Sequence, residues 1–242
     1  TGGTISRFTP EELLELYPSI KEIVNIDSKL ISNIFSEDMR FGHYNLIAKA
    51  IPLEMEKGVD GIIITHGTDT LHYTSAALSF ILENLSIPVI LVGAQRSSDR
   101  GSSDGRLNLE SACHFIAQTD FSGVAISMHE GSSDTSCVIL SALKTRKMHA
   151  SRRDAFKPIN TRPIARIEGS KIEVITPFKK VESKKLILKP IKEGLKIGML
   201  KVHPNLAVEE LRAYNKFDAL VIEGTGLGHV PINSFDKITE YN

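Results

Sequence analysis

The sequence is poor in the features that mark several large classes of protein. It has only two cysteines, Cys113 and Cys137, and they lie far apart in the chain. Two distant cysteines in a chain of 242 residues are not a disulfide framework, which favours a reducing compartment. No apolar run approaches the roughly 20 residues of a membrane-spanning helix, and no signal-peptide pattern opens the sequence. We therefore expect a globular, cytoplasmic protein that does not bind membranes.

A net charge is also lacking, because 29 basic and 29 acidic residues balance. A free-standing protein that binds nucleic acid or a membrane surface normally carries a basic excess, so the balance argues against both classes. Apolar residues, in contrast, make up 41% of the chain. A chain of this length buries roughly 70–75% of its unfolded surface, so it can fold without a disulfide or a metal.

Short apolar segments alternate with segments of helical periodicity. We predict strands at Val59–Thr65, Pro88–Val92 and Gly123–Met128. The segments between them, Leu71–Leu85 and Leu107–Ala117, have apolar residues at helical spacing. This alternation predicts an α/β fold with a doubly wound parallel sheet.

Three polar segments follow these strands: His66–Thr70, Gly93–Gly105 and His129–Asp134. The carboxyl ends of parallel strands share one edge of a sheet, and ligands bind outside that edge. We therefore expect the three loops to share one rim that carries the chemistry.

A change in composition predicts a second domain. Between Thr176 and Glu193 the sequence is rich in lysine and proline, and we place a linker at 179–193. Residues 1–178 then form the domain with the active site, and residues 194–242 begin a smaller α/β domain. The smaller domain is predicted to contain a strand, a helix and a strand, at Leu195–Val202, Ala207–Tyr214 and Phe217–Ile222.

Two motifs have both a structural and a functional interpretation. Thr1–Ile5 (TGGTI) is either an ordinary glycine turn or a backbone that approaches a ligand oxygen closely; a free Thr1 amine would instead indicate an N-terminal nucleophile. In His66–Thr70 (HGTDT), Asp69 or Thr70 either caps the following helix or faces a substrate.

Two longer polar segments are equally open to more than one interpretation. Gly93–Gly105 is either a solvated loop or part of a site, and it lacks the glycine spacing of a phosphate-binding loop. Lys144–Arg153 is a solvated basic face, a nucleic-acid patch, or the source of one lysine that turns into a cleft as a general base.

The sequence gives little sign of a cofactor. Glu223–His229 contains GxGxG after a predicted strand, but the third glycine is out of register for a dinucleotide fold. The eight histidines show no paired metal-binding spacing. We therefore expect no metal and no cofactor bound to this chain.

Together, TGGTI, HGTDT and Lys147 ahead of Asp154-Ala155-Phe156 resemble the bacterial-type L-asparaginase/glutaminase family over nearly the whole chain. Val92–Arg100 (VGAQRSSDR) and Lys147–Phe156 (KMHASRRDAF) look like the D-subunit branch, which serves archaeal glutamyl-tRNA(Gln) amidotransferases. The resemblance implies a flavodoxin-like N-terminal domain followed by a smaller α/β domain.

The resemblance also implies roles for individual residues. Thr4 matches the first nucleophile, and Thr68, Asp69 and Lys147 match the second threonine with its acid–lysine pair. Ser36 and Glu37 match the pair that binds the substrate, and Asp69 also faces the substrate's amino group.

For that branch, the implied reaction is hydrolysis of L-glutamine. Its ammonia would pass to an E-type partner subunit, which amidates Glu-tRNA(Gln) and holds the ATP and magnesium. A homodimer at the core of a heterotetramer is implied, and Gln95–Asp104 is the loop we expect to contact the partner. The alternatives are a stand-alone cytosolic L-asparaginase and a non-catalytic assembly subunit that docks RNA.

The sequence departs from the family pattern in three places. The strand that precedes TGGTI in the family is missing, as is the small β domain that precedes it in the D-subunit branch, and so is the end of the second domain. After TGGTI the family has a flap with a catalytic tyrosine, but here Ile5 leads directly to a helix start at Thr9-Pro10-Glu11-Glu12. We therefore expect a fragment, incomplete at both ends.

Overall fold

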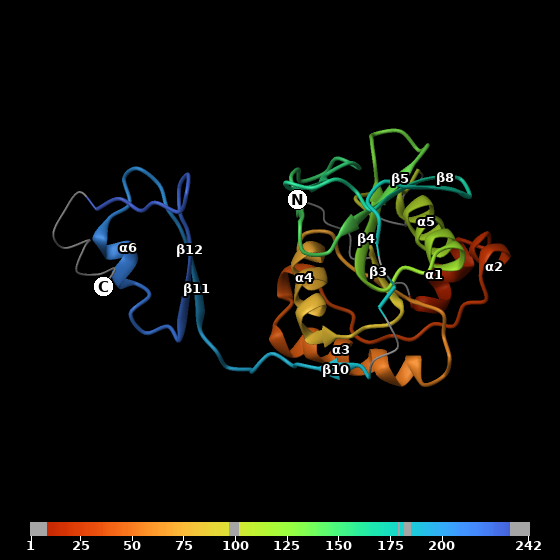
Figure 1. The fold of residues 1–242 in the computed structure, drawn as a ribbon, viewed down its shortest axis with the longest axis horizontal. Helices are drawn as coiled ribbons and strands as arrows, with labels where there is room; N and C mark the ends of the chain where they lie inside the picture. The colour runs from red at the N-terminus through yellow and green to blue at the C-terminus, as the bar shows by residue number, and fades with distance from the viewer. Residues whose placement is uncertain (1–8, 97–101, 179, 182–184, 233–242) are drawn as a thin grey trace. The chain divides into compact units, whose positions relative to one another are not determined.

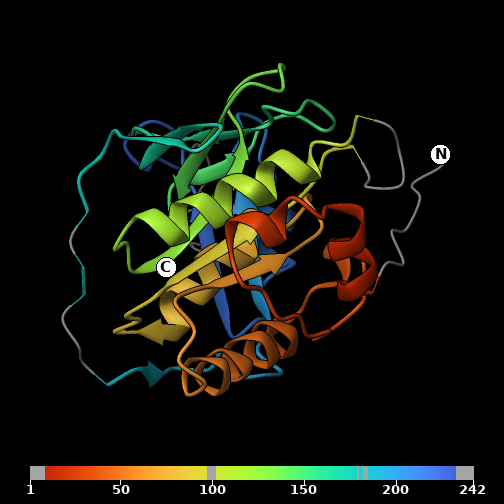
Figure 2. The same ribbon diagram turned by 90° about the vertical axis from the view of Figure 1, so that its right-hand side faces the viewer.

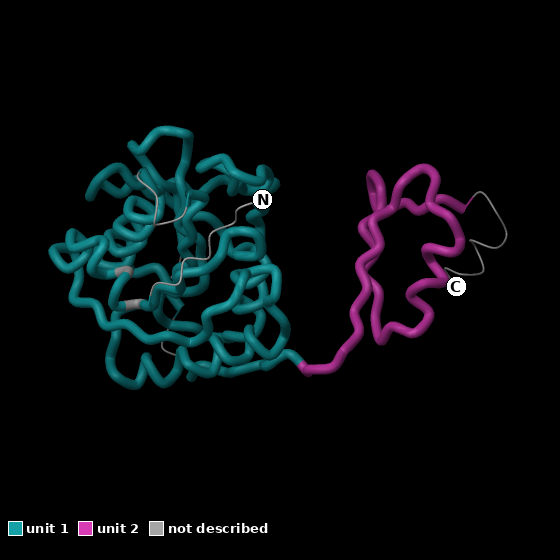
Figure 3. Tube along the Cα trace, turned by 180° about the vertical axis from the view of Figure 1, so that it is seen from behind, with its two compact units in different colours: residues 1–191 teal, residues 192–242 magenta. Residues whose placement is uncertain are grey.

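The computed structural model describes residues 9–96, 102–178, 180–181 and 185–232. The chain forms two compact units, residues 1–191 and 192–242 (Figure 3). The expected domain limits at 178 and 194 stay predictions. Within the segment expected as a linker, β10 (Ile187–Leu188) pairs with a strand of unit 1, β2 (Leu82–Glu83).

A six-stranded sheet with the order β1-β3-β4-β5-β8-β9 forms the centre of unit 1 (Figure 1). The three predicted strands are present and pair in parallel: β1 (Ile62–Thr65), β3 (Pro88–Val92) and β4 (Gly123–His129). The sheet continues through three antiparallel strands, β5 (Cys137–Ser141), β8 (Ala165–Glu168) and β9 (Lys171–Val174). Mixed pairing of this kind is common in large α/β sheets.

Helices cover both faces of the sheet (Figure 2). Their bounds are α1 (Pro10–Leu16), α2 (Ile20–Ile23), α3 (Phe41–Met55), α4 (Leu71–Ile81) and α5 (Gly105–Gln118). Alternate side chains of β3 point to opposite faces, as the pleat requires. Val89 and Leu91 pack with α3 and α4, whereas Ile90 and Val92 pack with α2 and α5. Both faces of the parallel strands are therefore buried, which explains their nearly continuous apolar sequence.

One observed helix end agrees with the prediction from the sequence, and another differs from it. α1 starts as predicted, because Thr9 and Glu12 form a reciprocal capping box, with Glu12 N donating to Thr9 Oγ1 at 3.2 Å. The predicted helix Leu71–Leu85 is too long, since α4 ends at Ile81 and the next two residues form β2.

Unit 2 contains the predicted strand, helix and strand. β11 (Ile197–Lys201) and β12 (Ala219–Glu223) pair in parallel, and α6 (Val208–Arg212) connects them. Leu200, Leu206 and Leu211 form the buried core of this unit. Across the described residues of both units, no helix is long and apolar enough to cross a membrane.

Candidate active site

The loop His66–Thr70 follows β1 directly, and a partly buried histidine fixes its first residues. His66 Nδ1 lies 2.7 Å from the Gly67 carbonyl oxygen, and Nε2 lies 2.8 Å from Thr74 Oγ1. A carbonyl oxygen only accepts, so Nδ1 carries the hydrogen and Nε2 accepts from the Thr74 hydroxyl. Burial lowers the pKa of His66. The neutral ring therefore ties the start of the loop to α4.

The same loop packs closely against a short 3₁₀ helix, η1 (Ser36–Asp38). Thr70 Oγ1 donates to the Ser36 carbonyl oxygen at 2.5 Å. A Cβ on Gly67 would lie only 2.8 Å from Ser36 Cβ, so this position needs a glycine. Ser36 Oγ in turn donates to Glu37 Oε2 at 3.2 Å. The expected substrate-binding pair thus lies directly beside the HGTDT loop.

Lys147 reaches this loop from a hairpin 79 residues further along the chain. The hairpin consists of β6 (Thr145–Lys147) and β7 (Phe156–Pro158). Lys147 Nζ donates to Thr68 Oγ1 at 2.9 Å and to Asp69 Oδ1 at 2.6 Å. The Lys147 side chain is only 8% exposed, whereas the Asp69 side chain is 63% exposed. The lysine is therefore held within proton-transfer distance of a threonine hydroxyl.

Five of the six residues expected at the site are brought together: Thr68, Asp69 and Lys147 are in contact, with Ser36 and Glu37 beside them. A cleft of unit 1 is lined by Ser36, Glu37, Thr68 and Asp69. Thr4, like the whole of Thr1–Ile5, lies outside the described residues. The catalytic and binding roles of all six residues stay predictions.

Three structural interpretations can be judged from these contacts. Thr70 occupies the N-cap position of α4 without a side-chain hydrogen bond to the helix, so the capping interpretation is wrong for its hydroxyl. The basic stretch Lys144–Arg153 is not uniformly solvated, because Lys147 turns inward. Gly93–Gly105 is also not a purely solvated loop, since Asp104 is fully buried.

Asp104 orders the loop that follows β3. Its carboxylate accepts from Gln95 N at 3.0 Å, from Arg96 N at 2.8 Å and from Asn108 Nδ2 at 3.2 Å. Gln95 Nε2 donates to the Arg152 carbonyl oxygen at 2.8 Å, in the turn of the β6–β7 hairpin. The loops after β1 and β3 are therefore both connected to the hairpin that carries Lys147.

The positioning groups His66 and Thr70 were not assigned from the sequence, although both belong to the HGTDT motif. The available signal was the motif itself, in which His66, Gly67 and Thr70 each contact a neighbouring element.

No cluster of three or more histidine, cysteine or acidic side chains suited to a metal occurs among the residues that the structure describes. The expectation of no metal or cofactor stays a prediction.

Comparisons with known proteins show which proteins the chain is similar to. The chain is 44% identical over 248 residues to a Methanococcus vannielii protein that is named as the D subunit of glutamyl-tRNA(Gln) amidotransferase; the match covers 100% of this chain and 58% of that protein. It is 46% identical over 241 residues to the protein of the same name from Pyrococcus furiosus, covering 98% of this chain and 55% of that protein. The chain thus spans little more than half the length of these relatives.

Among solved structures, the thermostable L-asparaginase from Thermococcus kodakarensis superimposes with a TM-score of 0.83 at 28% identity. The superposition covers 99% of this chain and 74% of that structure. It confirms the asparaginase-like α/β fold. Residues 1–180 also match the family described as "Asparaginase, N-terminal". With its lysine, aspartate and threonine together at the carboxyl end of the first parallel strand, the chain belongs to the asparaginase family.

Proposed function

We propose that this chain is the glutamine-hydrolysing part of the D subunit of an archaeal glutamyl-tRNA(Gln) amidotransferase. The observation that carries the proposal is the contact of Lys147 Nζ with Thr68 Oγ1 and Asp69 Oδ1. Amide hydrolysis needs this kind of arrangement, because an amide is a poor electrophile and requires an activated hydroxyl or water. The two archaeal relatives, both named as D subunits of this amidotransferase, support the choice of enzyme.

The reaction divides among the residues as follows. The oxygen of a hydroxyl group attacks the side-chain carbonyl carbon of glutamine, and Lys147, as general base, takes up the hydroxyl proton through Thr68. The carbon–nitrogen bond then breaks, the same proton passes to the leaving nitrogen, and ammonia departs. Water hydrolyses the resulting ester by the same proton path and releases glutamate. Thr4 is the proposed first nucleophile.

Substrate binding is assigned to the groups on the other side of the loop. The Asp69 carboxylate is largely exposed, so it can hold both Lys147 Nζ and the α-ammonium group of glutamine. Ser36 and Glu37 supply further hydrogen bonds to the amino-acid part of the substrate. All of these groups are polar or charged, which suits a zwitterionic amino acid.

The proposed ammonia acceptor is an E-type partner subunit in the cytoplasm, which binds Glu-tRNA(Gln) together with ATP and magnesium. In this proposal two copies of the chain form the dimeric core of a heterotetramer. The loop Gln95–Asp104 is the proposed contact with the partner, and Arg96 is its exposed cation at the described edge.

The test measures ammonia released from glutamine and from asparagine by the full-length protein alone, with its partner, and with partner and Glu-tRNA. A subunit that supplies a second site should be slow alone and faster in the complete assembly, since ammonia released earlier is lost. Stimulation that falls in Arg96→Ala would support the proposal. A high rate with asparagine that ignores the partner would identify the chain as a stand-alone asparaginase, the activity of the solved relative.

A further inference from the structure

A series of polar side chains linked by hydrogen bonds lies beneath the loops of the site, and it begins at the buried Asn108 on α5. Asn108 Nδ2 donates to the Gly93 carbonyl oxygen at 2.9 Å and to the Asp104 carboxylate at 3.2 Å. Both partners only accept, which fixes the orientation of the amide. Asn108 Oδ1 therefore faces the opposite way, toward His129 Nδ1 at 2.6 Å.

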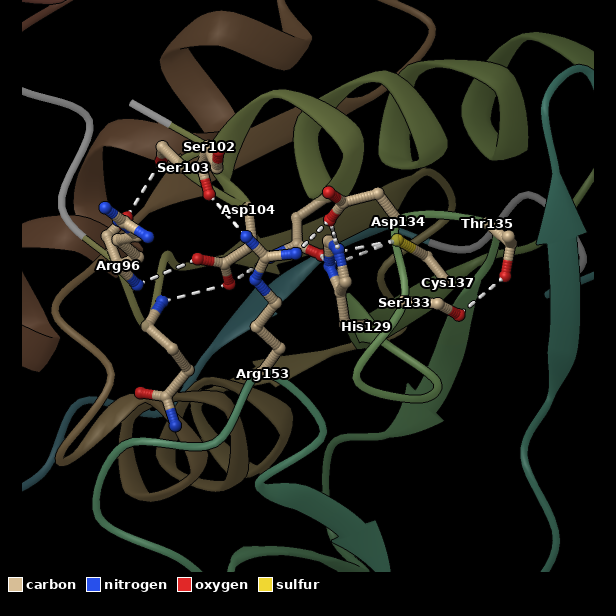
Figure 4. Close-up of polar contacts among 12 residues, drawn as sticks. Arg96, Ser102, Ser103, Asp104, His129, Ser133, Asp134, Thr135, Cys137 and Arg153 are labelled. Atoms are coloured by element: carbon tan, nitrogen blue, oxygen red, sulfur yellow. Dashed lines mark hydrogen bonds and ion pairs between the residues drawn. The ribbon is translucent and has the colours of Figure 1, made fainter. Parts of the chain in front are cut away.

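His129, at the end of β4, extends this series of hydrogen bonds to the next loop. Its side chain is fully buried, and Nε2 lies 3.1 Å from Asp134 Oδ1. Both ring nitrogens thus face hydrogen-bond acceptors. Cys137 Sγ also donates to Asn108 Oδ1 at 3.3 Å, and burial raises the pKa of this thiol to about 12, so it stays uncharged. Figure 4 shows His129, Asp134 and Cys137 close together near α5.

Arg153 joins this group of side chains from the turn of the β6–β7 hairpin. One guanidinium nitrogen donates to Asp134 Oδ1 and the other to the Ser102 carbonyl oxygen (Figure 4). Asp134 therefore lies between His129 and Arg153, and hydrogen bonds from these two hold the pKa of its carboxyl below the usual range. Because the Asp134 carboxylate is charged, the hydrogen bonds on both of its sides are charge-assisted.

Arg153 and Lys147 belong to the same hairpin, so the contact of Arg153 with Asp134 also bears on the position of Lys147. Arg153 lies in the turn between β6 and β7, whose base is closed by a hydrogen bond from Met148 N to the Ala155 carbonyl oxygen at 2.7 Å. Lys147 is the last residue of β6, immediately before this turn. An arginine that bonds to two separate loops limits how the hairpin can tilt. A tilt of the hairpin would move Lys147 Nζ away from Thr68.

We propose that Arg153 is a positioning residue: it anchors the β6–β7 hairpin, through the exposed Asp134, to the buried side chains of His129 and Asn108, and so holds Lys147 against Thr68 and Asp69. Arg153 itself does not touch the reacting groups. The inference rests on the proposed function only for its effect on turnover, because the position of Lys147 can be measured separately.

The experiment follows both quantities in the full-length protein. Acylation of lysines by an amine-reactive reagent is measured by mass spectrometry, with the exposed Lys144 as internal reference. Kinetic constants for glutamine are measured on the same samples. The variants are Arg153→Leu, Arg153→Lys and Asp134→Asn, and Arg162→Leu is the matched control because it removes the charge of an exposed arginine in the same unit.

We expect Lys147 to be acylated severalfold faster, relative to Lys144, in Arg153→Leu and in Asp134→Asn. In the same variants kcat should fall about ten- to a hundredfold, as expected for a small misplacement of a reacting group, with KM nearly unchanged. Arg153→Lys keeps a positive charge beside Asp134, so its acylation rate and kcat should lie closer to those of the unchanged protein. Arg162→Leu should change neither quantity.

Unchanged acylation of Lys147 in both Arg153→Leu and Asp134→Asn would overturn the inference. Asp134 is 57% exposed, so Asp134→Asn keeps the test valid even if Arg153→Leu fails to fold. Faster acylation in a protein that shows no glutaminase activity would support the positioning role and overturn the proposed function instead.

Discussion

Replacing Lys147 by methionine separates catalysis from stability, because the structure predicts a large effect on one and a small effect on the other. Methionine has a similar volume but no amine. If Lys147 is the general base, kcat for glutamine should fall by a factor of about a hundred to ten thousand. This range corresponds to about 2.7–5.4 kcal/mol in the activation free energy.

The effect on stability follows from the exposure of the two partners. Removing one member of a fully buried ion pair typically costs about 3–5 kcal/mol, because the remaining charge stays buried without a partner. Here the charge left behind is Asp69, whose side chain is 63% exposed and therefore solvated. Methionine also keeps the apolar contacts of the buried lysine stem. We expect the free energy of unfolding to change by about 1 kcal/mol or less.

The assay combines ammonia release by the full-length protein with urea denaturation of the same sample, and Lys144→Met is the control for loss of a lysine beside the same hairpin. A merely severalfold loss of activity would refute the role of Lys147 as base. A loss of about 3 kcal/mol or more in unfolding free energy would show instead that the lysine is needed mainly for folding.

Three further outcomes are expected. Gly67→Ala should raise KM for glutamine about tenfold, or about 1.4 kcal/mol, because the new Cβ would displace Ser36; an unchanged KM would contradict the close contact. The buried Cys137 thiol, with its pKa raised to about 12, should resist alkylation at about pH 8 until the protein unfolds, as mass spectrometry of native and denatured samples would reveal. Hydrogen bonds from Arg152 and Lys157 hold the pKa of the Asp154 carboxyl well below its usual range, so the carboxylate stabilises the fold at neutral pH. This contribution should be lost as the pH falls below about 4, and urea titrations should show a shallower acid dependence in Asp154→Asn.

Local patterns predicted the parallel half of the sheet well, for a clear physical reason. Val89 to Val92 are buried on both faces, so the strand is a continuous apolar run that can be recognised without knowledge of its neighbours. The capping box at Thr9 is also local, since both partners lie within four residues. Such features depend only on short stretches of sequence.

Features that depend on distant partners were not predicted. The apolar periodicity extends to Leu85, but the pairing of Leu82 with Leu188 of β10, more than a hundred residues away, ends α4 early. α3 was not recognised as a helix, and it contains Pro52 within its length. The basic stretch Lys144–Arg153 allowed one lysine to turn inward, but only the family resemblance indicated that it is Lys147, because its neighbours Arg146 and Met148 are ordinary exposed residues.

The separation of 79 residues between Thr68 and Lys147 has a consequence for how the protein folds. Three strands of the sheet, β3, β4 and β5, lie between the two residues in the chain, and closing so long a loop is entropically costly, so we expect their contact to form late. A partly folded chain that already contains the parallel strands would still lack the lysine contact. Recovery of activity during refolding should therefore lag behind recovery of helical circular dichroism, and the site would then report a late step in folding.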